Sequence, residues 1–164
     1  MIIAQLNAAH QRTGFHCEEA ALTRYLQQQA GQDMRRRLSV CFVATNNSNR
    51  VFGYYTLSSM SLSRESIPEA YVKRIPAHYD IPLVLLGRLA RDISVKGQGV
   101  GELLLLDALK RACQISAAHM GALAVVVDPI HDKAAAFYER YGFIRLPERN
   151  MMFLPKKQIE LLTL

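Results

Sequence analysis

The sequence predicts an α/β (α+β) fold in which helices flank a mixed central sheet. Short apolar runs rich in β-branched side chains alternate along the chain with segments whose apolar residues recur every three or four positions. Half of the residues are hydrophobic and 21% are charged, so the chain has enough apolar surface for a buried core. No linker, internal repeat or low-complexity segment interrupts the sequence. We therefore expect a single domain over residues 1–164.

The first third of the chain is predicted to form a helix followed by two strands. Residues 17–29 have the periodicity of an amphipathic helix. Its apolar positions are Ala21, Leu22, Tyr25 and Leu26. Residues 38–44 and 51–57 are short apolar runs typical of strands, and the asparagine-rich residues 46–49 predict the turn between them.

The middle of the chain is predicted to contain the longest strand and the longest helix. Residues 61–82 contain three prolines and mixed charges, which indicates a short helix with loops. Residues 83–93 are an apolar run, which we interpret as a long central strand. A glycine-rich segment at residues 96–101 then leads into the strong helix formers of residues 102–112.

The last third repeats this alternation on a smaller scale. Residues 122–127 predict a second buried strand, and residues 132–141 predict a short helix. That helix is expected to end at Gly142, because glycine suits a left-handed cap. Residues 143–144 and 151–154 are predicted as closing strands.

Cysteine usage and the apolar segments favour a cytoplasmic protein. The odd number and wide spacing of Cys17, Cys41 and Cys113 fit neither a disulfide framework nor a metal site. Residues 121–127 are too few for a membrane span, which needs about 20 residues. Residues 1–5 lack the basic start and apolar stretch of a secretory signal. We expect a reducing compartment and no metal cofactor.

Most of the positive charge lies in the middle of the chain. The formal net charge is +6, and residues 35–96 contain ten lysine or arginine residues against four carboxylates. Localised charge of one sign favours a polyanionic partner, such as a nucleic acid or a phosphorylated cofactor. A solvated basic face that only keeps the protein soluble is the alternative.

The glycine-rich loop is a candidate anion site. Alternate glycines between a strand and a helix let backbone N–H groups approach a ligand at the positive end of the helix dipole. A Walker loop is excluded, because no lysine followed by a hydroxyl residue stands here, and a dinucleotide fingerprint would need glycine where Glu102 is found. A plain turn that caps the helix remains the alternative.

A second motif lies about forty residues beyond the loop. It contains Phe137, Tyr138, Glu139, Gly142 and Phe143. Together with the strand Leu89–Ala90–Arg91–Asp92 and the glycine loop, in this order and spacing, it resembles the GCN5-related N-acetyltransferase (GNAT) superfamily. The resemblance implies that the loop binds the pyrophosphate of acetyl-CoA.

The resemblance extends residue by residue to the cofactor site, with two departures. Gly99 and Gly101 match the family's loop, Lys96 replaces the usual glutamine or arginine, and His131 replaces a frequent asparagine. The cofactor-binding residues implied are Leu89, Ala90, Arg91, Lys96, Gly97, Gln98, Gly99, Val100, Gly101 and Asp132.

A narrower resemblance covers nearly the whole chain. Residues 15–26, 52–57, 82–90 and 152–155 are similar to the acetyltransferase toxins of bacterial toxin–antitoxin pairs. Those toxins acetylate the α-amino group of aminoacyl-tRNA and inhibit translation, so the resemblance implies this transferase activity. It also implies a ribbon–helix–helix antitoxin and a homodimer. His16 stands where the group usually has aspartate, and Cys17 matches the group but is expected to be a small buried core residue.

Tyr138 is the predicted catalytic acid. The resemblance places its hydroxyl beside the cofactor sulfur, where it would protonate the leaving thiolate. An α-amino group has a pKa near ~8, so much of it is already neutral and no strong protein base is needed. A backbone N–H of Leu89–Ala90–Arg91 is the expected donor to the acetyl oxygen. The alternative for Tyr138 is an amphipathic core aromatic, and we expect Tyr141 to have that structural role.

The basic residues are interpreted as the tRNA-binding face. The candidates are Arg35, Arg36, Arg37, Lys73, Arg74 and Arg88. Arg88 is expected to reach the terminal adenosine of tRNA or its phosphates, because a guanidinium matches a phosphate as a bidentate donor. An internal salt bridge is the alternative for Arg88.

Two other functions stay open on the sequence. The first is the same acetyl transfer to a small amine or a protein amino group, which the localised basic charge disfavours. The second is a non-catalytic acyl-CoA-binding module, which the presence of Tyr138 disfavours.

Overall fold

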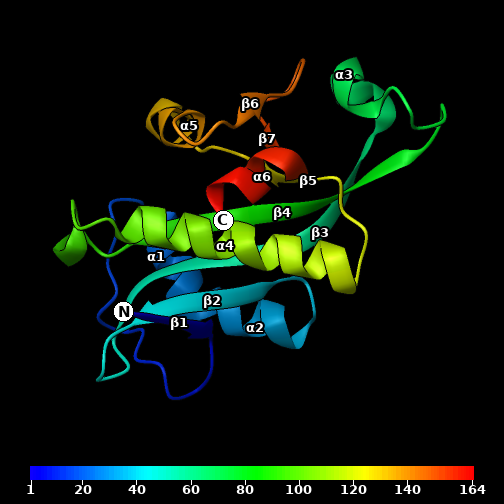
Figure 1. The fold of residues 1–164 in the computed structure, drawn as a ribbon. Coiled ribbons are helices and arrows are strands. Elements are labelled where there is room, and N and C mark those ends of the chain that lie inside the picture. Colours follow the sequence, from blue (N-terminus) through cyan, green and yellow to red (C-terminus); the bar gives the residue numbers. More distant parts are fainter. The chain divides into compact units, whose positions relative to one another are not determined.

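A seven-stranded mixed sheet organises the protein, which confirms the predicted fold class (Figure 1). The computed structural model describes all residues 1–164. The strands follow the order β1-β2-β3-β4-β5-β7-β6, and β4 and β5 form the parallel pair. The strands are β1 (Ile2–Gln5), β2 (Val40–Thr45), β3 (Val51–Ser63), β4 (Asp80–Arg91), β5 (Ala124–Val127), β6 (Ile144–Arg145) and β7 (Met152–Pro155).

The chain forms two compact units that share β3, β4 and the long helix α4 (Val100–Ala118). The first unit contains residues 1–58 and 87–108, and the second contains residues 59–86 and 109–164. No helix is long and apolar enough to span a membrane. All three cysteines are free thiols, and Cys17 and Cys41 are buried, as expected for Cys17.

In the first unit, a helical segment packs on the antiparallel strands β1 to β3. The predicted helix begins later and runs further than its periodicity indicated: α1 (Ala20–Arg24) continues through a π-helical turn, η1 (Tyr25–Gln29), into α2 (Ala30–Arg35). The helical turns bury the predicted Tyr25 and Leu26, and Ala30 extends the same apolar face. This extension follows from four-residue apolar spacing that continues beyond the predicted end.

The predicted hairpin forms with its expected turn. Val40 pairs with Leu57 and Cys41 with Thr56, so β2 and β3 are antiparallel. The side chain of Asn46 closes the turn by accepting hydrogen bonds from the Ser48 and Arg50 backbone N–H groups at 3.0 and 3.3 Å.

In the second unit, strands replace much of the predicted helix-and-loop region. β3 extends to Ser63 and β4 starts at Asp80, leaving only η2 (Arg64–Ser66) and α3 (Glu69–Val72) between them. The extensions are stabilised by burial, because Leu62, Ile81 and Leu83 belong to one hydrophobic cluster with Phe153 of β7. Local proline content could not reveal this pairing.

The remaining predicted elements form close to their expected positions. α5 (Asp132–Glu139) ends before Gly142, whose φ of 95° confirms the left-handed conformation. β5 pairs in parallel with β4 and antiparallel with β7. Two elements were not predicted from the sequence: β1 and a C-terminal helix, α6 (Lys156–Leu162), which buries Ile159.

Candidate active site

The glycine-rich loop joins the end of β4 to the start of α4 through one turn of 3-10 helix, η3 (Ile93–Val95) (Figure 1). Gly97 and Gly99 have φ values of 77° and 78°, which L side chains rarely adopt. A Cβ atom added at either glycine would meet no atom within 4 Å. The loop therefore exposes its backbone beside open space rather than beside packed side chains.

The start of α4 provides N–H donors for an anion. The first bond into the helix runs from the Leu103 N–H to the Gly99 carbonyl oxygen, at 3.0 Å. The N–H groups of Val100, Gly101 and Glu102 precede that bond and have no intrahelical acceptor. These donors and the helix dipole fit a pyrophosphate such as that of acetyl-CoA.

Asp92 supports the loop, a role that was not predicted from the sequence. Its carboxylate is only 3% exposed and accepts hydrogen bonds from the Ser94 N–H at 2.9 Å and the His16 N–H at 2.8 Å. The Ile93 N–H donates in turn to the His16 carbonyl oxygen at 2.9 Å. Burial would raise the pKa of the Asp92 carboxyl, but the hydrogen bonds from Ser94 and His16 and the charge of Arg50 lower it overall.

The hydrogen bonds of Asp92 also show that His16 has a structural role. The backbone of His16, rather than its side chain, ties the segment before α1 to η3. An aspartate two residues before a serine is a local signal for such a cap, because aspartate often accepts from the backbone N–H two positions later. The bond to His16 spans 76 positions of sequence, and no local pattern indicates it.

The two predicted cofactor-site cations Arg91 and Lys96 share one carboxylate. Both oxygens of Glu18 lie 3.1 Å from Nη1 of Arg91, and Oε1 lies 3.9 Å from Nζ of Lys96. Burial would raise the pKa of Glu18, but its own backbone N–H, Arg91 and Lys96 outweigh that effect and lower it. Lys96 is therefore held next to the loop glycines by a weak, exposed ion pair.

Close packing on Gly53 fixes α4 against β3. A Cβ atom at Gly53 would lie 2.8 Å from Cδ1 of Leu104 and 3.2 Å from both Cγ1 of Val100 and the carbonyl oxygen of Ala90. The first turn of α4 can approach the strands this closely only because residue 53 lacks a side chain. Gly53 thus positions the N-terminal end of α4.

Tyr138 lies on α5, within an aromatic cluster of the second unit. Its ring is 5.3 Å from that of Phe137 and 5.2 Å from that of Phe143. The residue is 8% exposed, and burial raises the pKa of its hydroxyl. No buried side-chain oxygen in the structure lacks a hydrogen-bond partner. Because the Tyr138 hydroxyl donates to no protein group, it must reach the surface.

This environment favours a protonated phenol at neutral pH, which is the state an acid needs. It lacks the protein hydrogen bond that would poise the proton for transfer. Tyr141 is partly buried, and its ring lies 5.3 Å from that of Phe137.

The start of α5 is capped by His131. Its Nδ1 accepts a hydrogen bond from the Ala134 N–H at 3.0 Å, so the residue that replaces the family's frequent asparagine serves as the N-cap. Asp132 follows as the first residue of the helix and is exposed.

The predicted tRNA-binding residues are at the surface of both units. Arg35, Arg36 and Arg37 are exposed at the end of α2, in the first unit. Lys73 and Arg74 are exposed in the turn after α3, in the second unit.

Arg88 forms no salt bridge, which removes the alternative considered for it. It stacks instead over the ring of Tyr25, at 3.6 Å from the ring centre. This partner was not expected from the sequence.

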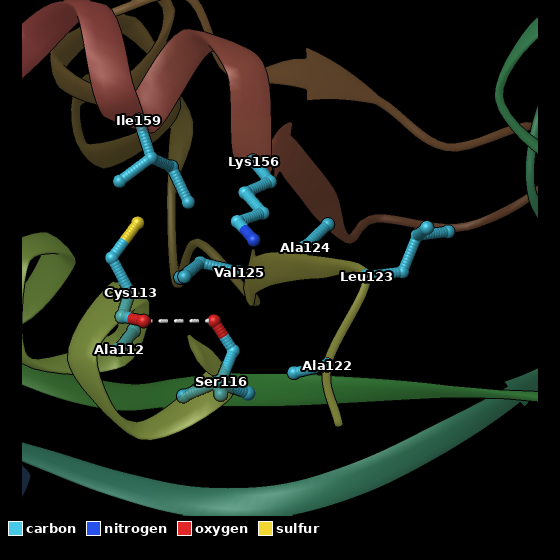
Figure 2. Close-up of a pocket in the computed structure, with 10 residues that line it drawn as sticks. Ala112, Cys113, Ser116, Ala122, Leu123, Ala124, Val125, Lys156 and Ile159 are labelled. Carbon is cyan, nitrogen blue, oxygen red and sulfur yellow. Dashed lines mark hydrogen bonds between the residues drawn. The ribbon is translucent and has the colours of Figure 1, made fainter. Parts of the chain in front are cut away.

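A small pocket in the second unit contains none of the predicted site residues. Cys113 and Lys156 line it together with Ser116, whose hydroxyl donates to the Cys113 carbonyl oxygen at 3.0 Å (Figure 2). Burial and the charge of Glu160 raise the pKa of the Cys113 thiol, which disfavours a nucleophilic thiolate. No group of three or more histidine, cysteine or acidic residues is arranged to hold a metal ion.

Comparison with protein families places most of the chain in one domain family. The acetyltransferase (GNAT) domain matches residues 37–145, which include the loop and Tyr138. A tRNA-acetylating toxin of Mycobacterium tuberculosis is 35% identical over 139 residues, which cover 85% of this chain and 81% of the toxin. A probable toxin TacT of Sinorhizobium fredii is 29% identical over 155 residues, covering 89% and 85%.

Solved structures agree over almost the full length. The crystal structure of a tyrosine-to-phenylalanine mutant of KacT has a TM-score of 0.89 and 34% identity, covering 98% of each chain. AtaT complexed with acetyl-methionyl-tRNAfMet has a TM-score of 0.89 and 33% identity, covering 99% of each chain. AtaTR bound with acetyl-CoA has a TM-score of 0.85 and 32% identity, covering 99% of this chain and 98% of that one.

Proposed function

The chain belongs to the acetyltransferase (GNAT) family, and on that premise we propose that it transfers the acetyl group of acetyl-CoA to the α-amino group of aminoacyl-tRNA. The observation that carries this proposal is the full-length similarity to AtaT complexed with acetyl-methionyl-tRNAfMet, at 33% identity over 99% of each chain. The tRNA-acetylating toxin of Mycobacterium tuberculosis supports the same substrate class. The protein would act in the cytoplasm, as one catalytic domain, by blocking translation.

The loop and the first turn of α4 would hold the cofactor. When bound, acetyl-CoA supplies an acetyl group activated as a thioester. The N–H groups of Val100, Gly101 and Glu102 would donate to its pyrophosphate, with Gly97 and Gly99 allowing close backbone approach. Lys96 would add a positive charge beside the same phosphates. The exposed, screened ion pair with Glu18 leaves that charge available.

Leu89, Ala90 and Arg91 would align the acetyl group along the end of β4, where a backbone N–H donates to its carbonyl oxygen. Tyr138 would deliver a proton to the departing sulfur, since burial keeps its phenol protonated. The attacking α-amino group is substantially neutral near pH 7–8, because its pKa is near ~8. The proposed reaction would therefore need no dedicated protein base.

The complexes formed by the same relatives indicate which partners this chain would have. AtaT is found in complexes with the antitoxin AtaR, and KacT with its partner KacA and DNA. We extend this to the present chain as an antitoxin with a ribbon–helix–helix domain, encoded nearby, and a homodimer of the toxin itself. A neighbouring gene of that kind, together with growth arrest on induced expression, would support the assignment.

The decisive experiment uses acetyl-CoA labelled in the acetyl group and total aminoacylated tRNA. Label should enter the aminoacyl group, and its identification names the amino acid modified. Polyamines and a peptide with a free N-terminus serve as competing acceptors, because acetylation of a small amine or a protein is the second candidate. Label in these acceptors and none in aminoacyl-tRNA would refute the proposal. Absence of label from every acceptor would favour a non-catalytic acyl-CoA-binding module.

A further inference from the structure

Arg88 is a half-buried cation that forms no ion pair within the protein. Its guanidinium lies 3.6 Å from the centre of the Tyr25 ring and makes no hydrogen bond or ion pair with the chain. No buried side-chain nitrogen in the structure lacks a partner, so the unpaired N–H donors of Arg88 reach the surface. Stacking covers one flat face of the group and leaves its in-plane donors free.

Tyr25 is held in place from several sides. Its hydroxyl donates to Oδ2 of Asp33 at 2.7 Å and lies 3.2 Å from Oγ of Ser39. Its ring stacks on the buried Tyr54 with 6.2 Å between ring centres, and the residue is 7% exposed. A ring fixed in this way limits the positions open to the guanidinium that lies over it.

The residues around Tyr25 and Arg88 carry more positive than negative charge. Asp33 is the carboxylate next to Tyr25, and hydrogen bonds from Gln29 and Tyr25, followed by the charges of Arg88 and Arg36, lower its pKa although burial opposes them. Arg12 contributes a further guanidinium, since its Nη1 donates to the Leu26 carbonyl oxygen in the π-helical turn at 3.3 Å. The guanidinium groups of Arg12, Arg36 and Arg88 therefore outnumber the Asp33 carboxylate in this part of the first unit.

We propose that Arg88 binds a backbone phosphate of the acceptor RNA. Tyr25 is the positioning residue that keeps the Arg88 guanidinium oriented toward that phosphate. The inference rests on the proposed function for the identity of that RNA. A planar guanidinium with free in-plane donors matches two oxygens of a phosphodiester, which an ammonium group cannot do. Asp33 accepts its hydrogen bond from the hydroxyl of Tyr25 and forms no ion pair with Arg88, although the two charges attract each other, so the in-plane donors of Arg88 stay available to the ligand.

Binding of uncharged tRNA tests the phosphate contact without any acetyl transfer. Arg88→Met should weaken binding about tenfold and reduce the log–log salt slope by roughly 0.7–0.9, the value for one neutralised phosphate. Arg50→Met is the matched control, because Arg50 also stacks on an aromatic ring, 4.7 Å from the centre of Phe52, and the substitution removes the same charge. Equal weakening in both variants, or no change in Arg88→Met, would overturn the proposal.

Two substitutions test the positioning role of Tyr25. Tyr25→Phe keeps the ring but removes the hydrogen bond to Asp33, whereas Tyr25→Leu removes the stack. We expect Tyr25→Leu to raise the KM for aminoacyl-tRNA about as much as Arg88→Met does, with kcat and the KM for acetyl-CoA unchanged, and Tyr25→Phe to restore most of the affinity. A general structural defect would instead lower kcat and change both KM values, and this result would refute the role.

The remaining outcomes also decide the question. An effect of Arg88→Met on acetyl-CoA affinity alone would assign the phosphate to the cofactor and contradict the proposal. If aminoacyl-tRNA is not acetylated but uncharged tRNA still binds through Arg88, the proposed function fails while the phosphate contact stands. If Tyr25→Leu does not fold, the comparison of Arg88→Met with Arg50→Met still decides the phosphate contact, and Tyr25→Phe decides the positioning role.

Discussion

Removal of the Asp92 carboxylate should both destabilise the protein and loosen its glycine-rich loop. Asp92→Ala leaves the N–H groups of Ser94 and His16 without the acceptor that they have at 2.9 and 2.8 Å. A hydrogen bond to a charged group contributes about 1.5–3 kcal/mol, and water that enters the vacated site will recover part of that. We therefore expect the free energy of unfolding to fall by about 2–4 kcal/mol.

Asp92→Asn separates charge from shape. The amide oxygen can replace one acceptor, but the amide NH2 meets the other backbone N–H, so we expect a decrease of about 1–2 kcal/mol in the free energy of unfolding. The fold lowers the pKa of Asp92 relative to the unfolded chain, so its stabilisation is present above about pH 4 and disappears as the pH falls through the folded pKa. The difference in stability between wild type and Asp92→Asn should shrink accordingly below about pH 4.

Urea unfolding between about pH 3 and 8 measures these differences, and calorimetry measures acetyl-CoA affinity in the same proteins. Asp128→Asn is the control, because Asp128 is exposed and its side-chain hydrogen bond with Asn150 is long at 3.4 Å. We expect weaker acetyl-CoA binding in both Asp92 variants and a change of less than about 0.5 kcal/mol in the control. Wild-type stability and affinity in Asp92→Ala would refute the supporting role of the carboxylate.

Three further variants, one of them with three substitutions, test the proposed roles. Tyr138→Phe should keep the fold and acetyl-CoA binding while turnover falls roughly 10²–10⁴-fold; near-normal turnover in single-turnover assays would remove Tyr138 from the mechanism. Gly101→Asp should weaken acetyl-CoA binding at least about tenfold in calorimetry, because its carboxylate would face the phosphates at the start of α4. Gly121→Asp, in an exposed loop with free space around residue 121, is its control, and equal affinities in both variants would show that the glycine-rich loop is only a turn. Replacement of Arg35, Arg36 and Arg37 by alanine should weaken tRNA binding and flatten the salt slope by roughly 0.7–0.9 for each phosphate that is no longer bound, with acetyl-CoA affinity intact. An unchanged slope would mean that these exposed arginines are only solvated.

The sequence by itself determined the fold class, the order of most elements and the two motifs of the acetyltransferase family. These features depend on interactions between residues that are close together in the sequence. The four-residue apolar spacing of α1 and α4, the asparagines of the first turn and the left-handed glycines at 97, 99 and 142 all act within a few residues of the chain. The match of residues 37–145 to the acetyltransferase domain confirms the family that those motifs implied.

Only the tertiary structure decided where strands end and which groups support the site. Burial of Leu62 and Ile81 in one cluster extends β3 and β4 through a region whose prolines predicted loops. Pairing of Ile2 with Thr45 creates β1 from a segment without a strand pattern of its own. Three contacts join residues that are distant in sequence: the hydrogen bond between Asp92 and His16, the stacking of Arg88 on Tyr25, and the close packing of α4 on Gly53. Such contacts arise from packing, which gives burial and hydrogen-bond partners to residues that local patterns leave undetermined.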